Sequence, residues 1–191
     1  MREAELTRKT RETEISVKLN LDGEGRVETA TGVAFLDHLI RTLGVHSRID
    51  LKIEARGDLK HHITEDVGIC LGETLRKALG DGVGINRFGY AIILMDDALA
   101  VAAVDLVTRP YAKINLPIDS DLIEGSVKQD LLHFLETFTT SLRATIHINI
   151  QYGTNDHHKV EAAVKALALS LRQAVAISPS SKNVPSAKGS I

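Results

Sequence analysis

The residues of this chain that could do chemistry belong to a His-His-x-x-Glu motif. The motif occurs twice, at His61, His62 and Glu65 and again at His157, His158 and Glu161. Imidazole and carboxylate groups are suitable ligands for Mn, Fe, Co, Ni or Zn ions, and the absence of thiolate argues against a structural zinc site. One such motif could equally consist of surface or capping histidines. Two copies in matching places favour metal binding.

Each copy also has an upstream histidine, His38 for the first and His133 for the second. Six of the eight histidines therefore lie at equivalent positions of two half-chains. Neighbouring residues on a helix point about 100° apart, so the two histidines of a pair cannot easily bind one ion together. We expect them to serve two separate metal sites, with four ligands each and open positions left on an octahedral ion. The eight predicted ligands are His38, His61, His62, Glu65, His133, His157, His158 and Glu161.

The composition excludes several classes of function. The net charge is −2, the basic residues are scattered and only 4% of residues are aromatic, which gives no reason to expect nucleic acid or an anionic membrane as a partner. The longest apolar run, Tyr90 to Met95, is far too short to span a bilayer. The single cysteine, Cys70, suits a reducing compartment, and the N-terminus lacks the apolar core of a signal peptide. These features predict a cytoplasmic protein.

Hydrophobic periodicity predicts the elements that must position the motif. In the first half we expect a strand over Arg8 to Leu21, a hairpin turn at residues 22–25 with a return through Thr31, a helix over Val33 to His46, a strand over Ile49 to Ala55 and a helix over residues 61–80. The second half repeats this order, with strands at Phe88 to Leu94, Ala98 to Val107 and Ile146 to Ile150, a short edge piece near Lys113, and helices at Val127 to Leu142 and from Val160 to Val175.

The predicted fold class is therefore α+β, with two tandem, pseudo-symmetric β-β-α-β-α halves, each a small sheet with helices on one face. We assign residues 1–86 to the first half and 87–178 to the second. Residues 179–191 are rich in Pro and Ser, and we expect this tail to become ordered when a phosphate group binds.

A set of further motifs makes the chain resemble a known family. They are Phe35-Leu36-Asp37-His38, the two His-His-x-x-Glu copies, Gly84 to Gly89, Asp96-Asp97-Ala98, Arg109-Pro110-Tyr111, His133-Phe134 and Pro185 to Gly189. From Arg8 to Gly189 the chain resembles imidazoleglycerol-phosphate dehydratase. Two local departures from the family pattern, Lys60 and Asp156, remove no presumed ligand.

This resemblance implies a hydro-lyase of histidine biosynthesis that converts imidazoleglycerol phosphate to imidazoleacetol phosphate and water. It also implies manganese, with two ions for each active site. The hydrogen that is lost is not next to a carbonyl group, so an ordinary enolate route is closed. A metal on the substrate's ring would stabilise an imidazolate, which expels the hydroxyl group through a diazafulvene-like intermediate.

The resemblance also implies roles for individual residues. The expected catalytic residues are Glu14, Glu65 and Glu161, and the expected substrate-binding residues are Glu14, His38, His46, Arg87, Arg109, Ser186 and Lys188. Among these, Arg87, Arg109, Ser186 and Lys188 resemble a phosphate clamp. Asp96 and Asp97 are either turn residues, which we favour slightly, or acid/base groups and supports for the site.

Two alternatives belong to other classes. A metal-buffering or structural metalloprotein would use duplicated His/Glu clusters but would not need Arg87, Arg109 and Lys188. A metal-dependent hydrolase would need both features, although the substrate-facing motifs do not fit one. The resemblance further implies a small-molecule phosphate substrate and a large, cubic-symmetric homo-oligomer built from trimers, with active sites at the subunit contacts.

Overall fold

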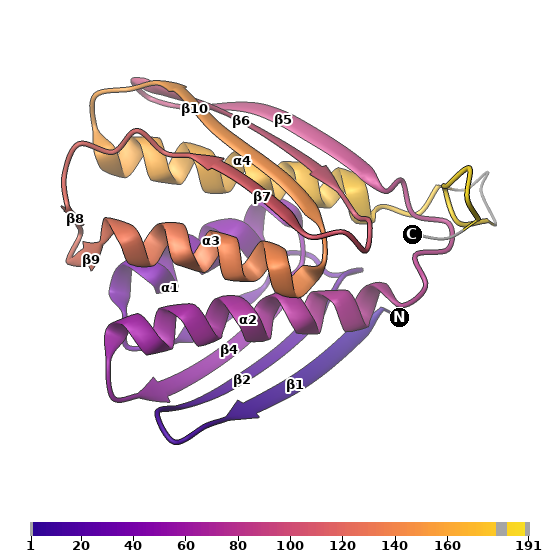
Figure 1. The fold of residues 1–191 in the computed structure, drawn as a ribbon, viewed down its shortest axis with the longest axis horizontal. Helices are drawn as coiled ribbons and strands as arrows, with labels where there is room; N and C mark the ends of the chain where they lie inside the picture. Colours follow the sequence, from indigo (N-terminus) through magenta and orange to yellow (C-terminus); the bar gives the residue numbers. More distant parts are fainter. Residues whose placement is uncertain (1, 179–182, 190–191) are drawn as a thin grey trace.

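In the described residues, two four-stranded sheets enclose a layer of four helices (Figure 1). This architecture comes from a computed structural model that describes residues 2–178 and 183–189. Residues 179–182 and 190–191 of the predicted tail lie outside the described residues. None of the described helices combines the length and the apolar character needed to cross a bilayer.

The first half forms the sheet at the bottom of Figure 1, with strand order β1-β2-β4-β3. Its elements are β1 (Glu3–Lys9), β2 (Thr13–Asn20), β3 (Val27–Ala30), α1 (Ala34–Ser47), β4 (Asp50–Gly57) and α2 (Lys60–Leu79). The second half forms the other sheet, with strand order β5-β6-β10-β7. Its elements are β5 (Phe88–Met95), β6 (Ala98–Asp105), β7 (Tyr111–Asn115), β8 (Leu122–Ile123), β9 (Ser126–Val127), α3 (Lys128–Leu142), β10 (Thr145–Tyr152) and α4 (Asp156–Val175).

The two halves share one topology, which confirms the predicted α+β fold and its internal duplication. In each half the last strand pairs antiparallel with the second strand and parallel with the third. The equivalent helices α1 and α3 also end alike, because Arg48 and Arg143 both adopt the left-handed conformation at the C-cap. The helices of both halves pack in one layer, so the division at residue 86 stays a prediction.

The predicted hairpin at residues 22–25 is wrong, and the described residues form more strands than the three of each predicted β-β-α-β-α half. The first half has four strands, and the second half has six, of which β7 is the edge piece predicted near Lys113. The hairpin lies earlier, between β1 and β2, where the Thr10 hydroxyl accepts hydrogen bonds from the backbone N–H of Glu12 and Thr13. At residues 24–26, three consecutive backbone N–H groups donate to the Asp50 carboxylate. These bonds hold the chain beside the start of β4, so β3 runs parallel to β4 instead of returning along β2.

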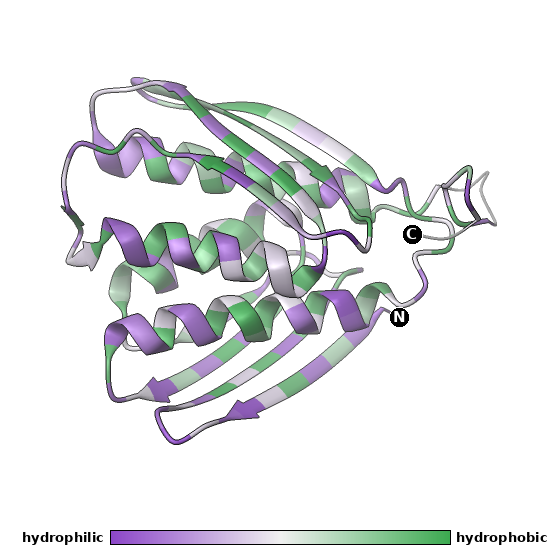
Figure 2. Ribbon diagram, in the orientation of Figure 1, coloured by the Kyte–Doolittle hydropathy of each residue, from purple (hydrophilic) through white to green (hydrophobic). Residues whose placement is uncertain are grey.

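The core lies between each sheet and its helices, as the alternation along the strands predicts. In β2, Ile15, Val17 and Leu19 are buried, whereas the residues between them are half-buried or exposed. Figure 2 shows hydrophobic and hydrophilic residues alternating along the strands of this sheet. The helices α2 and α3 approach especially closely, because Gly68 and Gly72 of α2 have no side chain. A Cβ atom at either position would clash with α3. This close approach sets the distance between the functional side chains of the two helices.

Candidate active site

One group of potential metal ligands lies where the N-terminal part of α2 meets α3. His133 Nε2 is 3.2 Å from Glu65 Oε1, and one donor atom from each of His61, Glu65 and His133 lies within 4.8 Å of the others. The rings of His61 and His133 stack at a centroid distance of 5.7 Å. We call this group the Glu65 cluster.

An equivalent group lies where α4 meets α1. Glu161 Oε2 is 3.1 Å from His38 Nε2 and 3.1 Å from His157 Nε2. The three residues His38, His157 and Glu161 again place their donor atoms within 4.8 Å of one another, and we call them the Glu161 cluster. Each cluster therefore takes a histidine and a glutamate from one half of the chain and a histidine from the other half.

The second histidine of each pair points elsewhere, as the angle between helix neighbours requires. His62 Nδ1 lies 2.7 Å from Asp58 Oδ1, and His158 Nδ1 lies 2.6 Å from Asp97 Oδ1. The structure thus brings six of the eight predicted ligands together in two clusters and leaves His62 and His158 outside both. Asp58 beside it raises the pKa of His62.

All four paired histidines have a carboxylate at Nδ1, and of these four carboxylates the sequence analysis considered only Asp97 as a support for the site. The partners of the first histidines are Asp130, 2.7 Å from His61, and Glu124, 3.2 Å from His157. A carboxylate at Nδ1 holds the N–H tautomer there and leaves Nε2 free to bind a metal. Asp58, four residues before His62, had a usable sequence signal, whereas Asp130 and Glu124 are distant from their partners in the chain.

Asp97, which the sequence left between two roles, supports His158. Its other oxygen, Oδ2, accepts hydrogen bonds from the Thr154 hydroxyl and from the backbone N–H of Thr154 and Asn155. These bonds, first that of the Thr154 hydroxyl and then that of His158, hold the pKa of Asp97 far below its ordinary value. Asp97 is therefore an ionised group that orients an imidazole.

Lys165 distinguishes the two clusters electrostatically. Its Nζ lies 2.7 Å from Glu161 Oε1, so one oxygen of this carboxylate is held by an ammonium group and the other faces the two histidines. Burial acts to raise the pKa of Glu161, but hydrogen bonds from Lys165 and His38 outweigh it and lower this pKa to about 2. The equivalent residue next to Glu65 is Ile69, and no sequence signal drew attention to the difference.

The other predicted substrate-binding residues at this end are Glu14 and His46. Glu14 lies on the face of β2 away from the helices, 2.7 Å from Arg56 and 3.1 Å from Lys9. Hydrogen bonds from Arg56 and then Lys9 lower the pKa of Glu14. His46 lies two turns after His38 on α1, and its pKa is lowered by burial and by the charge of Lys165.

The predicted phosphate clamp forms a separate hollow of about 340 Å³. Its lining includes Arg87, Arg109, Ser186 and Lys188, so the structure brings all four of these residues together. The Arg87 guanidinium makes a two-point contact with Asp105, at 2.6 and 3.0 Å, and also donates to the Pro185 carbonyl.

The phosphate clamp and the His/Glu clusters lie at opposite ends of the folded molecule. The backbone N–H of Arg87 donates to the Ala174 carbonyl near the end of α4, whereas His157 lies at its start. The helical rise between those positions is about 26 Å, at about 1.5 Å for each residue.

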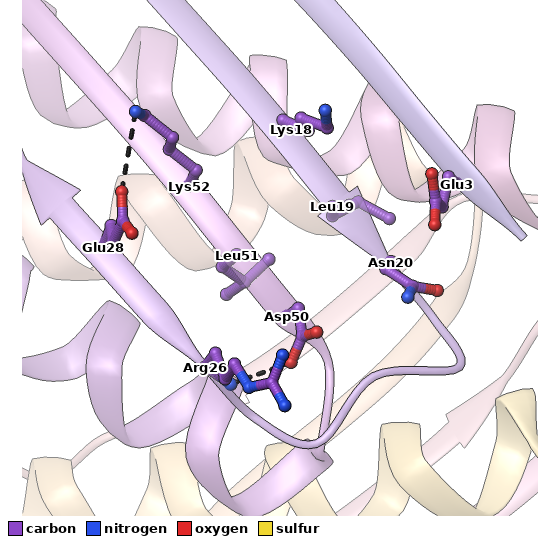
Figure 3. A pocket seen from close by; sticks show the side chains of 9 residues that line it. All are labelled: Glu3, Lys18, Leu19, Asn20, Arg26, Glu28, Asp50, Leu51 and Lys52. Atoms are coloured by element: carbon purple, nitrogen blue, oxygen red, sulfur yellow. Dashed lines mark hydrogen bonds and ion pairs between the residues drawn. The ribbon is translucent and has the colours of Figure 1, made fainter.

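Another hollow, with a volume of about 320 Å³, lies on the first sheet (Figure 3). It contains none of the predicted site residues, and its charges compensate one another. Lys52 Nζ is 3.5 Å from Glu28, and Asp50 accepts backbone hydrogen bonds. We assign it no role.

The fold and the site together define a class: a duplicated α+β protein with two His/Glu clusters, each built from both halves, and a separate cationic hollow. Residues 31–171 match the family model of imidazoleglycerol-phosphate dehydratase. The chain is 46% identical to a relative of that name from Methanothermobacter thermautotrophicus, over 100% of this chain and 98% of the relative. The relative of the same name from Bacillus licheniformis is 44% identical, over 99% of each chain.

Solved structures show the same likeness. The crystal structure of the enzyme from Pyrococcus furiosus superposes with a TM-score of 0.86 at 40% identity, covering 97% of this chain and 100% of that one. The structure from Staphylococcus aureus gives a TM-score of 0.85 at 31% identity, covering 92% of this chain and 99% of that one. The chain belongs to the imidazoleglycerol-phosphate dehydratase family and is an enzyme.

Proposed function

We propose that this enzyme eliminates water from imidazoleglycerol phosphate to form imidazoleacetol phosphate in histidine biosynthesis, with two Mn²⁺ ions at each active site. The observation that carries the proposal is the pair of His/Glu clusters in a chain of this family. The buried free thiol of Cys70 suits a reducing compartment, and we propose that the enzyme works in the cytoplasm.

The residues of both clusters fit a divalent metal ion. Ligand atoms about 2.1 Å from one octahedral ion lie about 3 Å apart when they occupy neighbouring positions. Glu161 Oε2 is 3.1 Å from Nε2 of His38 and of His157, and His133 Nε2 is 3.2 Å from Glu65 Oε1. When bound, a divalent ion would make the substrate's imidazole ring easier to ionise and would hold it in place. The donor set of nitrogen and carboxylate oxygen suits manganese but does not select it over iron, cobalt or zinc.

Other residues of the chain would bind the phosphate group and accept a proton. Arg109, Lys188 and Ser186 would bind the phosphate group, and the pairing of Arg87 with Asp105 would hold its guanidinium at the rim of the hollow. Glu14, kept ionised by Arg56, is available to accept the proton that the substrate loses.

The separation within one chain supports composite sites. A ring and a phosphate group joined by three carbons span less than about 10 Å, because each residue-sized step of an extended chain covers about 3.5 Å. A clamp about 26 Å from the Glu161 cluster along α4 cannot hold the phosphate of a substrate whose ring lies in the same chain's cluster. We infer that the clamp and the clusters of one active site come from different copies of the chain. The outward side chains of Glu14, His62 and His158 would then reach a neighbour's site.

The outer face of the second sheet supports assembly into a homo-oligomer. The edge strand β5 carries four large apolar side chains that are 58–72% exposed, namely Phe88, Tyr90, Ile92 and Leu94. At the matching edge of the first sheet, β1 presents Glu3, Glu5, Thr7 and Lys9. A contiguous exposed apolar strip of this kind marks an interaction site. A large cubic-symmetric assembly of trimers would cover it and unite the two parts of each site.

Subunit mixing tests the function and the composite site together. In an assay with imidazoleglycerol phosphate as the substrate and Mn²⁺ as the metal, we expect Glu161→Gln to abolish turnover and Lys188→Ala chiefly to raise KM. An Arg109→Ala, Lys188→Ala double variant should be nearly inactive. Co-assembly of this double variant with Glu161→Gln should restore activity, because some sites then combine an intact clamp with an intact cluster. Wild-type protein without dehydratase activity would refute the function, whereas an active wild type with no restoration in the mixture would refute the composite site alone.

A further inference from the structure

The second half contains an insertion that the first half lacks. Between β3 and α1 the chain needs only residues 31–33, whereas residues 116–127 connect β7 to α3 and include the short hairpin of β8 and β9. We call residues 116–127 the strap. It ends beside the Glu161 cluster, because Glu124 at the tip of its hairpin lies 3.2 Å from His157 Nδ1.

A buried lysine anchors the strap to α4. Lys159 Nζ lies 2.8 Å from Asp119 Oδ2 and 2.9 Å from Asp156 Oδ1, and its side chain is only 4% exposed. The Asp156 carboxylate also accepts hydrogen bonds from the backbone N–H of Asp119 and Ser120. Three charged groups thus join the strap to the first turn of α4, next to His157.

The duplication shows that packing alone does not require this lysine. The equivalent residue of the first half is Ile63, which is 8% exposed and belongs to the apolar core. Burying an ammonium group is costly unless it is paired, and an apolar residue of similar volume normally serves a core at least as well. The lysine is therefore explained by what it holds in place.

The strap that Lys159 holds affects only the Glu161 cluster. A carboxylate at Nδ1 fixes the tautomer and the orientation of an imidazole that binds metal through Nε2. In the Glu65 cluster this carboxylate is Asp130, which sits on the rigid helix α3. In the Glu161 cluster it is Glu124, which is 59% exposed at its side chain and whose backbone adopts φ +48° in the hairpin turn. Glu124 can stay at His157 only if the strap is held.

We propose that Lys159 is a positioning residue for the Glu161 cluster: it clamps the strap to α4, and the strap holds Glu124 against His157. The inference rests on the proposed metal sites. It makes the two clusters differ in a definite way, since the metal affinity of the Glu161 cluster depends on Lys159 and that of the Glu65 cluster does not.

The main experiment compares Lys159→Met with Ile63→Met, which places the same side chain at the equivalent position of the other half. Mn²⁺ affinity is measured by electron paramagnetic resonance in two backgrounds, each of which disables one cluster. In the Glu65→Gln background we expect Lys159→Met to weaken Mn²⁺ binding 10- to 100-fold and Ile63→Met to change it less than about threefold. In the Glu161→Gln background, Lys159→Met should also change it less than about threefold.

Glu124→Gln keeps the test decisive if Lys159→Met folds poorly. Glu124 lies on the surface, so this variant should retain stability and reproduce the loss of affinity in the Glu65→Gln background alone. Equal loss in both backgrounds for Lys159→Met, or no loss for Glu124→Gln, would overturn the proposal.

A metal-free measurement separates this inference from the metal sites themselves. Amide hydrogen exchange of residues 116–127 should accelerate at least tenfold in Lys159→Met and remain at the wild-type rate in Ile63→Met. Unchanged exchange in Lys159→Met would overturn the clamp whatever the metal data show. Wild-type protein that binds no Mn²⁺ would refute the proposed metal sites and, with them, the role of Lys159 in metal affinity, while accelerated exchange would still support the clamp.

Discussion

Gly68→Ala tests how the contact between α2 and α3 holds the Glu65 cluster. Gly68 lies one turn after Glu65, and a Cβ atom added there would lie 2.8 Å from the Phe134 carbonyl oxygen and 2.5 Å from Thr137 Oγ1. Ordinary contacts begin at 3.4 Å. The Thr137 side chain can rotate away, but the Phe134 carbonyl belongs to the backbone of α3. The helices must therefore separate by about 0.6 Å at this level.

Two opposing terms set the expected stability. Overpacking of this kind lowers the free energy of unfolding by about 1–3 kcal/mol, whereas replacing a helical glycine with alanine raises it by about 1 kcal/mol. We expect a net loss of about 1 kcal/mol in the free energy of unfolding. The same movement separates His133 from Glu65, which are 3.2 Å apart. Displacing a ligand by more than about 0.5 Å spoils a site, so Mn²⁺ affinity of the Glu65 cluster should fall about tenfold.

The assay is urea unfolding of metal-free protein at one fixed protein concentration, followed by circular dichroism. The exposed position Glu73 of the same helix provides the calibration, because the difference between Glu73→Ala and Glu73→Gly measures the intrinsic preference for alanine in α2. If Gly68→Ala were more stable than the wild type by that same difference, α2 and α3 would have room to spare and the reasoning would be refuted.

Three further predictions concern other parts of the molecule. Asp97→Asn should weaken Mn²⁺ binding about 10- to 100-fold in an electron paramagnetic resonance titration, because it removes the carboxylate that orients His158; unchanged affinity would contradict that role. Burial acts to raise the pKa of Asp50, but hydrogen bonds from three backbone N–H groups outweigh it and lower this pKa. The ionised carboxylate therefore stabilises the fold above its unfolded pKa of about 4, and this stabilisation is lost as the pH falls below that value. Asp50→Asn should therefore cost about 1–2 kcal/mol at pH 7 and the difference should narrow towards pH 2 in urea titrations; a constant difference would be the contrary result. Removal of the metal with EDTA should shrink the particle in light scattering, because ligands shared between copies link binding to assembly, and an unchanged size would count against shared ligands.

The elements that bury one regular face were predictable from the sequence. The helices α1 and α3 begin and end within a residue of their predicted bounds, because their apolar residues recur at the helical period. The pairing of β3 was not predictable in the same way. The Asp50 carboxylate accepts a hydrogen bond from the backbone N–H of Arg26, 24 residues earlier in the chain. This contact places β3 beside β4, on the side away from β2. A local turn pattern carries no information about such a contact.

In the candidate site, too, some residues were predictable from the sequence and others were not. Duplication made the six residues of the two clusters identifiable, since the same types recur 95 or 96 residues apart. The groups behind them come from other elements, such as Asp130, which is 69 residues from His61. Lys159 and Lys165 break the symmetry of the halves, so a search for repeated residues passes over them.

Each His/Glu cluster depends on both copies of the repeat. Within one half the upstream histidine and the His-His-x-x-Glu motif do not meet, because His38 lies with Glu161 and His133 lies with Glu65. Because the two copies are parts of one chain, each carries its own substitutions. Lys165 and Ile69, like Lys159 and Ile63, are such changes. The two clusters, which occupy equivalent places in the two halves, thereby differ in their charges and in the groups that support them.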